Sequence, residues 1–337
     1  MTTPTTPVLK ATGLHRHFEG VHAVAGVDLE VAPGQTVAII GPNGSGKTTT
    51  LNLVTGVLRP NSGKIAIRGH VVAARHPEQV ATAGVLRTFQ NGRVFGNLTV
   101  AENISVGLHR ELRAHRPLKR LAEIPVLRWF LGWLSLLGEV LASLLPLPGT
   151  GKERKEIERR VAAEIDRFPE RLGNRTEDLA YTLSYANRRR TEIARSLAGR
   201  PTLLVLDEPT AGMNQSETAE MLEQLLRLKA AGQSILLVEH KLDLVMTLSD
   251  HVLVMDDGHV IASGPPEQVR NDPAVIEAYL GRPEDDRRRA RRRPDRMPHG
   301  CAPQSSTYGM SGTSSTSAGT LPTASSPAAS AATVTTS

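Results

Sequence analysis

Residues 41–49 combine glycines with a lysine and two threonines, in types and spacing that suit phosphate binding. Glycine permits backbone angles that a Cβ atom forbids and lets a ligand approach the chain closely. Lys47 is expected to reach the outer phosphates of a nucleoside triphosphate, and the Thr48 hydroxyl to ligate Mg²⁺. The predicted binding residues are Gly41, Pro42, Asn43, Gly44, Ser45, Gly46, Lys47, Thr48 and Thr49.

The chain on both sides of this loop supports the same interpretation. Residues 37–40 form an apolar run typical of a buried strand, and residues 48–57 are expected to form a helix. A loop between a strand and a helix directs backbone N–H groups and the positive end of the helix dipole at an anion. The alternative is a glycine-rich turn that ends in Lys-Thr and binds no nucleotide.

A second group of polar side chains follows another apolar run, at residues 203–206. Asp207 and Glu208 then lie at the carboxyl end of a predicted buried strand, where α/β sheets bind their ligands. Asp207 is expected to hold Mg²⁺, directly or through water, and Glu208 to orient or deprotonate an attacking water. The alternative is a turn alone, since Asp-Glu-Pro also favours turns.

The elements that must position these groups indicate an α/β fold of the P-loop type. Short extended segments at 8–11 and 27–31 predict an antiparallel sheet ahead of the loop, and a further strand is expected at 64–68. Three later apolar runs lack alternation, as buried parallel strands covered by helices do. These runs are residues 203–206, 235–238 and 252–255.

The composition narrows the class of protein. Of the 337 residues 39% are apolar, enough for a large core, and the single cysteine, Cys301, cannot form an internal disulfide. No zinc-type spacing and no secretory signal are apparent, so a reducing cytoplasm is expected. Part of the net charge of +6 comes from an Arg-rich segment at 284–296 without neighbouring aromatic residues, which argues against nucleic-acid binding.

Further motifs give the chain a resemblance to ATP-binding-cassette (ABC) ATPases. Residues 183–190 resemble the signature motif of that family, residues 88–90 its glutamine loop, residues 211–214 its dimer loop and residues 239–240 its switch histidine. Together with the phosphate loop and the adjacent carboxylates, these motifs follow the order of the family. The resemblance covers residues 8–281 and implies a RecA-like core with an antiparallel β subdomain and an α-helical subdomain.

The resemblance implies roles for individual residues. Phe18, or His17 instead, would stack on adenine, although an aromatic residue here also suits the core. Gln90 would sense Mg²⁺ and the γ-phosphate while touching a membrane partner, and His240 would hydrogen-bond the γ-phosphate and the attacking water. The active unit would be a head-to-tail dimer with two ATP molecules. The signature residues expected to contact the ATP of the second subunit are Ser184, Tyr185 and Ala186.

Within the family, the chain resembles ATP-binding subunits of branched-chain amino acid importers. The supporting residues are 87–90, 98–103, 211–214, 265–269, 278–281 and the tyrosine of Leu-Ser-Tyr. This implies ATP and Mg²⁺ as cofactors, and permease subunits, a second ABC ATPase subunit and a substrate-binding protein as partners, at the cytoplasmic face of the cell membrane. Urea and amide importers share the pattern. A low-turnover regulatory subunit and a soluble ABC ATPase are further alternatives.

The signature departs from the family pattern at Ala186 and Asn187, where Gly-Gln is usual. Glycine at that position lets a backbone N–H approach the γ-phosphate of the opposing ATP. The Ala186 methyl group is expected to hold this N–H off or to forbid the required backbone angles. We therefore predict weaker closure of the composite site that this signature serves.

Three segments are expected to lie outside the cassette pattern. The insert at 111–155 contains an apolar stretch at 126–145 with a narrow polar stripe. The stripe predicts an interfacial helix, a helix on the permease, or a helix in the core of a helical subdomain at about 92–195. A membrane span there is excluded, because it would separate the phosphate loop from the carboxylates. Residues 1–7 are expected to be flexible, and the Arg-rich, then Ser/Thr/Ala-rich residues 282–337 to be disordered.

Overall fold

The computed structural model describes residues 6–72, 76–88, 94–109 and 150–280. All of them belong to the first of two units, Met1–Arg287 and Arg288–Ser337. The predictions made for Gln90, for the apolar stretch at 126–145 and for the tail at 282–337 lie outside the described residues.

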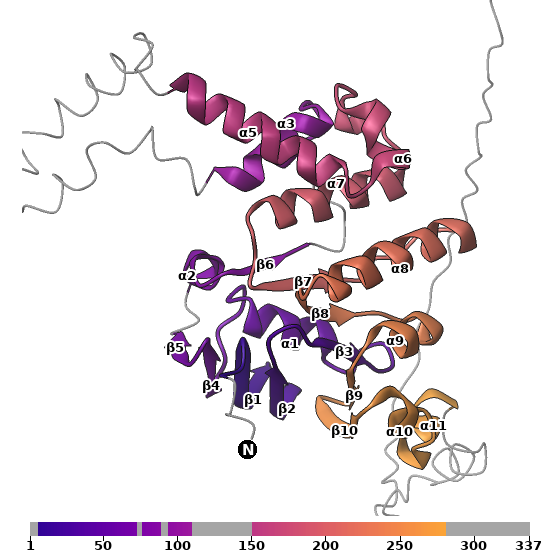
Figure 1. Cartoon of the computed structure of the whole chain (residues 1–337). Coiled ribbons are helices and arrows are strands. Elements are labelled where there is room, and N and C mark those ends of the chain that lie inside the picture. Colours follow the sequence, from indigo (N-terminus) through magenta and orange to yellow (C-terminus); the bar gives the residue numbers. More distant parts are fainter. Residues whose placement is uncertain (1–5, 73–75, 89–93, 110–149, 281–337) are drawn as a thin grey trace, which may run out of the picture. The chain divides into compact units, whose positions relative to one another are not determined.

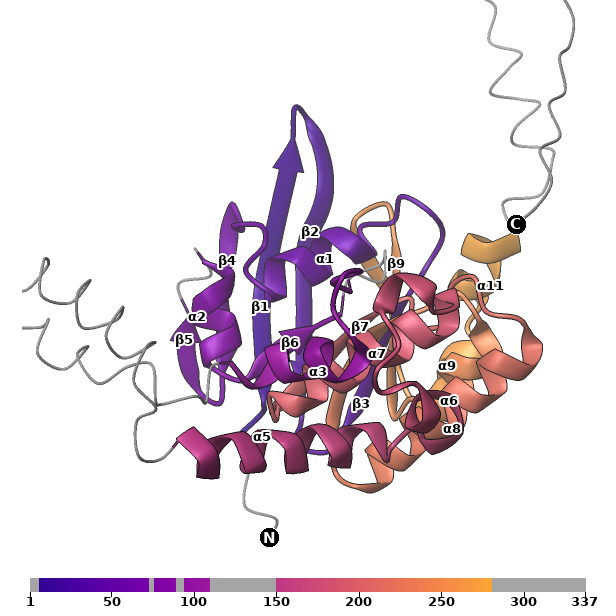
Figure 2. The same cartoon turned by 90° about the horizontal axis from the view of Figure 1, so that it is seen from above.

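The antiparallel sheet predicted ahead of the phosphate loop is present, with strand order β2-β1-β4-β5, and its last two strands follow the loop in the sequence. Figure 2 shows β1 and β2 side by side as a long hairpin. Leu9, Leu14 and Val27 are buried where this sheet packs into the core. β4 ends one residue earlier than expected, because Arg68, with φ 50°, turns the chain into β5. The strands are β1 Leu9–Phe18, β2 Val21–Val31, β4 Ser62–Ile67 and β5 His70–Val72.

The second sheet of the described chain contains the predicted apolar runs in the order β10-β9-β3-β8-β7-β6. Neighbouring strands are parallel except β10, which pairs antiparallel with β9. Every residue of β3, β7 and β8 is buried, as expected for strands covered on both faces. The strands are β3 Thr36–Ile40, β6 Val85–Arg87, β7 Leu203–Asp207, β8 Ser234–Val238, β9 His251–Asp256 and β10 His259–Gly264.

Four helices pack together at the top of Figure 1, in the range predicted for the helical subdomain except that α7 ends three residues beyond it. Their buried residues, among them Ile104 and Ile193, share one apolar cluster with Leu204 and Leu206 of β7. One apolar core therefore joins these helices to the strand that ends in Asp207. These helices are α3 Val100–Leu108, α5 Thr150–Ile165, α6 Pro169–Leu172 and α7 Tyr185–Ala198, with 3₁₀ turns η1 Gly173–Arg175 and η2 Ala180–Thr182 between α6 and α7.

The remaining described helices accompany the two sheets. α1 ends at Val54 rather than at 57, because the chain turns at Gly56, which has φ 74°. α8 starts with a capping box in which Asn214 and Glu217 satisfy each other's backbone N–H groups. The helices are α1 Lys47–Val54, α2 Pro77–Thr82, α8 Gln215–Ala230, α9 Leu242–Leu248, α10 Pro266–Arg270 and α11 Pro273–Leu280.

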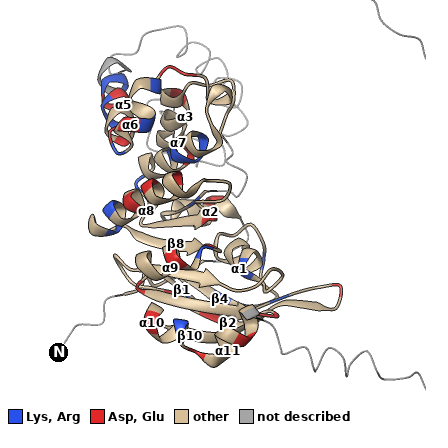
Figure 3. Ribbon diagram, turned by 90° about the vertical axis from the view of Figure 1, so that its right-hand side faces the viewer, with Lys and Arg blue, Asp and Glu red and all other residues tan. Residues whose placement is uncertain are grey.

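Helix α5 carries charges of both signs along its length (Figure 3). Arg159 and Arg160 both pair with Glu156, and Arg154 pairs with Glu158. Such pairs one turn apart support an exposed helix. Among the described helices, none combines the length and the apolar character needed to cross a membrane.

Candidate active site

The phosphate loop joins β3 to α1 in a backbone shape that requires glycine. Gly41, Gly44 and Gly46 have φ values of 148°, 86° and 98°. A Cβ atom on Gly41 would lie 2.0 Å from the Met255 carbonyl oxygen, and one on Gly46 would lie 2.2 Å from the Ala23 carbonyl oxygen. Strands β9 and β2 therefore close in on the loop and leave no room for side chains there.

Lys47, the first residue of α1, folds back over the loop. Its Nζ donates to the carbonyl oxygens of Gly41 and Pro42, at 2.9 and 2.8 Å. Burial lowers the pKa of this ammonium group, and the nearby Glu208 carboxylate opposes the effect. No side chain caps α1 at Gly46, so the first N–H groups of the helix remain directed at the loop. A phosphate bound there would offer Lys47 an anionic partner in place of the carbonyls.

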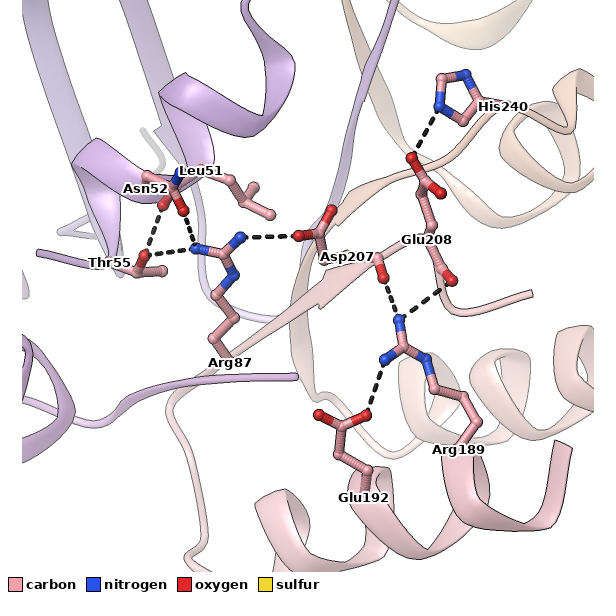
Figure 4. Close-up of polar contacts among 9 residues, drawn as sticks. All are labelled: Leu51, Asn52, Thr55, Arg87, Arg189, Glu192, Asp207, Glu208 and His240. Atoms are coloured by element: carbon pink, nitrogen blue, oxygen red, sulfur yellow. Dashed lines mark hydrogen bonds and ion pairs between the residues drawn. The ribbon is translucent and has the colours of Figure 1, made fainter. Parts of the chain in front are cut away.

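Asp207, the last residue of β7, is linked to α1 by Arg87 (Figure 4). Nη2 of Arg87 lies 2.7 Å from Asp207 Oδ2, and the two side chains are 7% and 3% exposed. Nη1 donates to Asn52 Oδ1 at 2.6 Å and to Thr55 Oγ1 at 3.1 Å. Arg87 of β6 thus joins β7 through a buried ion pair and α1 through two hydrogen bonds, a role that its place beside the glutamine loop did not predict.

The surroundings of Asp207 fit a hard cation. Its second oxygen, Oδ1, is buried and has no hydrogen-bond partner among the described residues. Thr48, another predicted ligand, lies in the first turn of the helix that Arg87 links to Asp207. No group of three His, Cys, Asp or Glu side chains in the described ranges could hold a metal ion. A Mg²⁺ ion here would therefore complete its shell with phosphate and water, as this ion commonly does.

Glu208 and His240, both predicted to act on the attacking water, meet in the structure. Oε1 of Glu208 lies 2.9 Å from Nε2 of His240. Glu208 has φ 49°, and its N–H donates to the Val238 carbonyl oxygen at 2.9 Å. The N–H of His240 donates to Glu239 Oε2 at 3.0 Å, and the other oxygen of Glu239 accepts a hydrogen bond from Thr210. Buried polar contacts thus fix the backbone on which His240 stands.

A second buried arginine, Arg189 on α7, also reaches this end of β7. It donates to the carbonyl oxygens of Asp207 and Glu208 and pairs with Glu192 (Figure 4). In the sequence it is one of three consecutive arginines, which look like a solvent-exposed run. The only signal for its partner is the helical spacing of Arg189 and Glu192, three residues apart.

The signature residues open helix α7. Ser184 caps the helix by accepting a hydrogen bond from the Asn187 N–H at 3.3 Å. Tyr185 is exposed and lies against Gly212 of the dimer loop, where an added Cβ would be 3.4 Å from its ring. Ala186 is 3% exposed, belongs to the apolar core and is not among the residues with positive φ. In this conformation the backbone of Ala186 is an ordinary helical one, and the expected effect of its methyl group on the composite site remains a prediction.

Phe18 ends β1 and is 40% exposed, so it lies outside the core. Cζ of Arg16 lies 4.5 Å from the centroid of its ring. The N–H of His17 donates to Asn61 Oδ1 at 3.0 Å, and its ring centroid lies 6.0 Å from that of His22. Phe18 therefore offers an exposed ring at the end of the hairpin, and its stacking on adenine remains a prediction.

Comparison with known proteins shows the family to which this chain belongs. The ABC transporter family matches residues 24–211, and the branched-chain amino acid ATP-binding cassette transporter family matches residues 259–285. The chain is 37% identical over 277 residues to the high-affinity branched-chain amino acid transport ATP-binding protein BraF of Pseudomonas aeruginosa. This match covers 82% of this chain and 98% of BraF. LivG of Escherichia coli, with the same description, is 37% identical over 276 residues, with coverage of 82% and 98%.

Solved structures extend the similarity to the fold. The ADP conformation of MJ1267, an ATP-binding cassette of an ABC transporter, has 30% identity and a TM-score of 0.62, covering 82% of this chain and 100% of that one. A nucleotide-free ATP-binding cassette has 29% identity and a TM-score of 0.61, with the same coverage. The predicted cassette fold is thus confirmed. The chain belongs to the ABC transporter family, as an ATP-binding subunit of the branched-chain amino acid type.

Proposed function

We propose that this chain, with Mg²⁺ as cofactor, hydrolyses ATP and thereby drives the uptake of branched-chain amino acids through a membrane importer. The contact between Glu208 and His240, 2.9 Å from Oε1 to Nε2, carries the proposal. β8 separates β7 from β3 in the sheet, and all three strands are parallel. The carboxylates and the phosphate loop therefore share one edge, where parallel sheets bind ligands.

The phosphate loop is the proposed binding site for the phosphates of ATP. Its backbone N–H groups and the start of α1 surround the phosphates, and Lys47 leaves the Gly41 and Pro42 carbonyls to pair with the β- and γ-phosphates. An anion is the better partner for a buried ammonium group, because it favours the charged form that burial disfavours. When bound through Asp207 and Thr48, Mg²⁺ supplies charge neutralisation on the phosphates.

Hydrolysis falls to Glu208 and His240. Glu208 orients the attacking water or accepts its proton, and His240 hydrogen-bonds the γ-phosphate. In the structure the two side chains are hydrogen-bonded to each other. The water and the γ-phosphate would enter between them and replace this hydrogen bond. Gln90 is assigned the link from the γ-phosphate to the permease.

A second ABC subunit completes the site. The N-terminus of α7, with Ser184 and the exposed Tyr185, would meet the ATP of that subunit, and the signature of that subunit would meet the ATP on Lys47. A cassette of the same fold, 20% identical with a TM-score of 0.59, is described as dimeric. The dimer is formed either by two copies or with a different ATPase subunit.

The transported molecule is inferred from the relatives. BraF and LivG are both described as branched-chain amino acid transport proteins, and the chain spans 98% of each. The proposed assembly therefore includes permease subunits and a substrate-binding protein, with this chain bound peripherally at the cytoplasmic face of the membrane.

Reconstitution of the chain with its permeases and second ATPase subunit in liposomes tests this function. ATP-dependent uptake of labelled leucine is expected. Glu208→Gln should reduce ATP hydrolysis about 10²–10⁴-fold, the usual contribution of general acid–base catalysis, and leave ATP binding intact. Glu223→Gln is the matched control, since Glu223 is an exposed glutamate on α8. Full hydrolysis in Glu208→Gln would refute the proposed base, and uptake of urea instead of leucine would refute the substrate.

A further inference from the structure

We propose that Arg189 is a positioning residue for Glu208, so that the signature helix α7 sets the geometry of the ATP site in its own chain. The inference rests on the proposed role of Glu208 as the residue that acts on water. It assigns the buried arginine a task in the reaction in addition to its place in the core.

The Arg189 guanidinium holds backbone atoms at the end of β7. Nη2 donates to the carbonyl oxygens of Asp207 and Glu208, the second at 3.1 Å. Nη1 donates to Glu192 Oε2 at 2.8 Å, one turn farther along α7. Figure 4 shows these contacts converging on the guanidinium. The two carbonyls belong to the peptide groups on either side of the Glu208 Cα, so together they constrain both φ and ψ of Glu208.

Glu208 needs this constraint because its backbone is left-handed, with φ 49°. A residue with a Cβ atom adopts this region at a free-energy cost and keeps it only where its surroundings enforce it. On the β8 side, the Glu208 N–H donates to the Val238 carbonyl oxygen at 2.9 Å. Relaxation of φ would swing the side chain around the Cα and move the carboxylate away from Nε2 of His240, now 2.9 Å from it.

Stability alone does not account for the ion pair that supports Arg189. Arg189 and Glu192 are each 1% exposed. Apolar residues of similar volume commonly stabilise a protein as well as a buried ion pair does. They cannot donate hydrogen bonds to two carbonyls, however. The ion pair is therefore explained by its effect on Arg189, whose Nη2 it directs at the two carbonyl oxygens.

Helix α7 connects this constraint to the signature. Ser184 caps the helix, and Arg189 lies a little over one turn beyond that cap. The helix that presents the signature to the ATP of the second subunit thus also holds the backbone of Glu208. A shift of α7 on dimer closure would reach Glu208 through one rigid element, without passing through the permease.

The full-length chain with Arg189→Met and Glu192→Leu tests the proposal, because it replaces the ion pair by an apolar pair of similar volume. We expect thermal unfolding and ATP affinity close to wild type. Amide hydrogen exchange at Glu208 should become about tenfold faster or more as this segment loosens. Hydrolysis in the reconstituted transporter should fall about 10²-fold, the effect of a misplaced reacting group. Arg189→Lys keeps one charged donor, so its exchange rate at Glu208 and its rate of hydrolysis should lie between those of the wild type and those of the double variant.

The matched control is Arg227→Met with Glu223→Leu, which removes an exposed ion pair on α8 and should change neither readout. Unchanged exchange at Glu208 in the Arg189 double variant would overturn the proposal, and so would wild-type hydrolysis there while Glu208→Gln is inactive. If Glu208→Gln itself keeps wild-type hydrolysis, the proposed role of Glu208 as the base fails instead. The exchange measurement still decides whether Arg189 holds Glu208.

Discussion

The phosphate loop and the signature both lead into the N-terminus of a helix, yet the two are built differently. In the loop, left-handed glycines lie against the Met255 and Ala23 carbonyls, and no side chain caps α1. In the signature, the Ser184 side chain caps α7, and Ala186 continues an ordinary helix with its methyl group in the core. The N-terminus of α1 therefore has no side-chain cap in the place where an anion would bind. At the N-terminus of α7, the Asn187 N–H already donates to Ser184.

This difference shows which half of the ATP site the chain builds by itself. The phosphate half is fixed by β2, β9 and the Arg87 bridge between α1 and Asp207, all within one chain. In the proposed dimer, the signature half meets ATP only on a second subunit, and within this chain its helix is already capped by Ser184. Substitutions in the phosphate half are therefore expected to alter folding and binding together, and those in the signature half to alter chiefly the assembled dimer.

Arg87→Met is expected to have the largest effect. It removes the charged partner of Asp207, whose side chain is 3% exposed. Breaking a buried ion pair from one side lowers the free energy of unfolding by about 3–5 kcal/mol. Urea unfolding of the nucleotide-free chain measures this loss. Adding Asp207→Asn to Arg87→Met should recover part of it, because the unpaired charge is then gone, and no recovery would show that Arg87 acts through packing alone.

Gly41→Ala should come next, with a loss of about 2–3 kcal/mol from backbone strain and overlap. Its Cβ would lie 2.0 Å from the Met255 carbonyl oxygen. Gly44→Ala is the matched control, because Gly44 is also left-handed, with φ 86°, and an added Cβ meets nothing within 4 Å. Chemical unfolding of both variants separates the overlap at Gly41, with the β9 carbonyl and the Ser45 hydroxyl, from the cost of placing alanine at a positive φ. Equal losses would contradict the claim that β9 shapes the loop.

The sequence predicted the elements whose pattern is local. The runs that became β3, β7, β8 and β9 are continuously apolar, and the loop residues follow the first of them directly. The contacts of Arg87 and Arg189 were not predicted, because they depend on which strands become neighbours. Arg87 pairs with a carboxylate 120 positions away, across a sheet order that no short motif encodes.

A smaller effect should appear in the pH dependence of stability, through Lys47. Burial lowers its pKa from 10.5, so between the folded-state value and 10.5 the unfolded chain binds more protons than the folded one. The free energy of unfolding therefore gains a contribution from Lys47 that rises with pH in that window and is absent in Lys47→Met. Urea unfolding of both nucleotide-free proteins from neutral pH to 10.5 measures the difference. Parallel curves would contradict the lowered pKa.

Ala186→Gly should have the smallest effect on stability and the most direct bearing on the signature half. It places glycine in the first turn of a helix, at a cost of up to about 1 kcal/mol. If the methyl group holds the backbone N–H away from the opposing ATP, ATP hydrolysis by the reconstituted dimer should rise, by up to about tenfold if part of one donor is regained. Ala194→Gly is the matched control, since Ala194 is also buried on α7 but lies beyond the signature. Both variants share the helix cost, so only a rise specific to Ala186→Gly supports an impaired composite site, and equal rates would mean that the signature of this chain works with alanine in place.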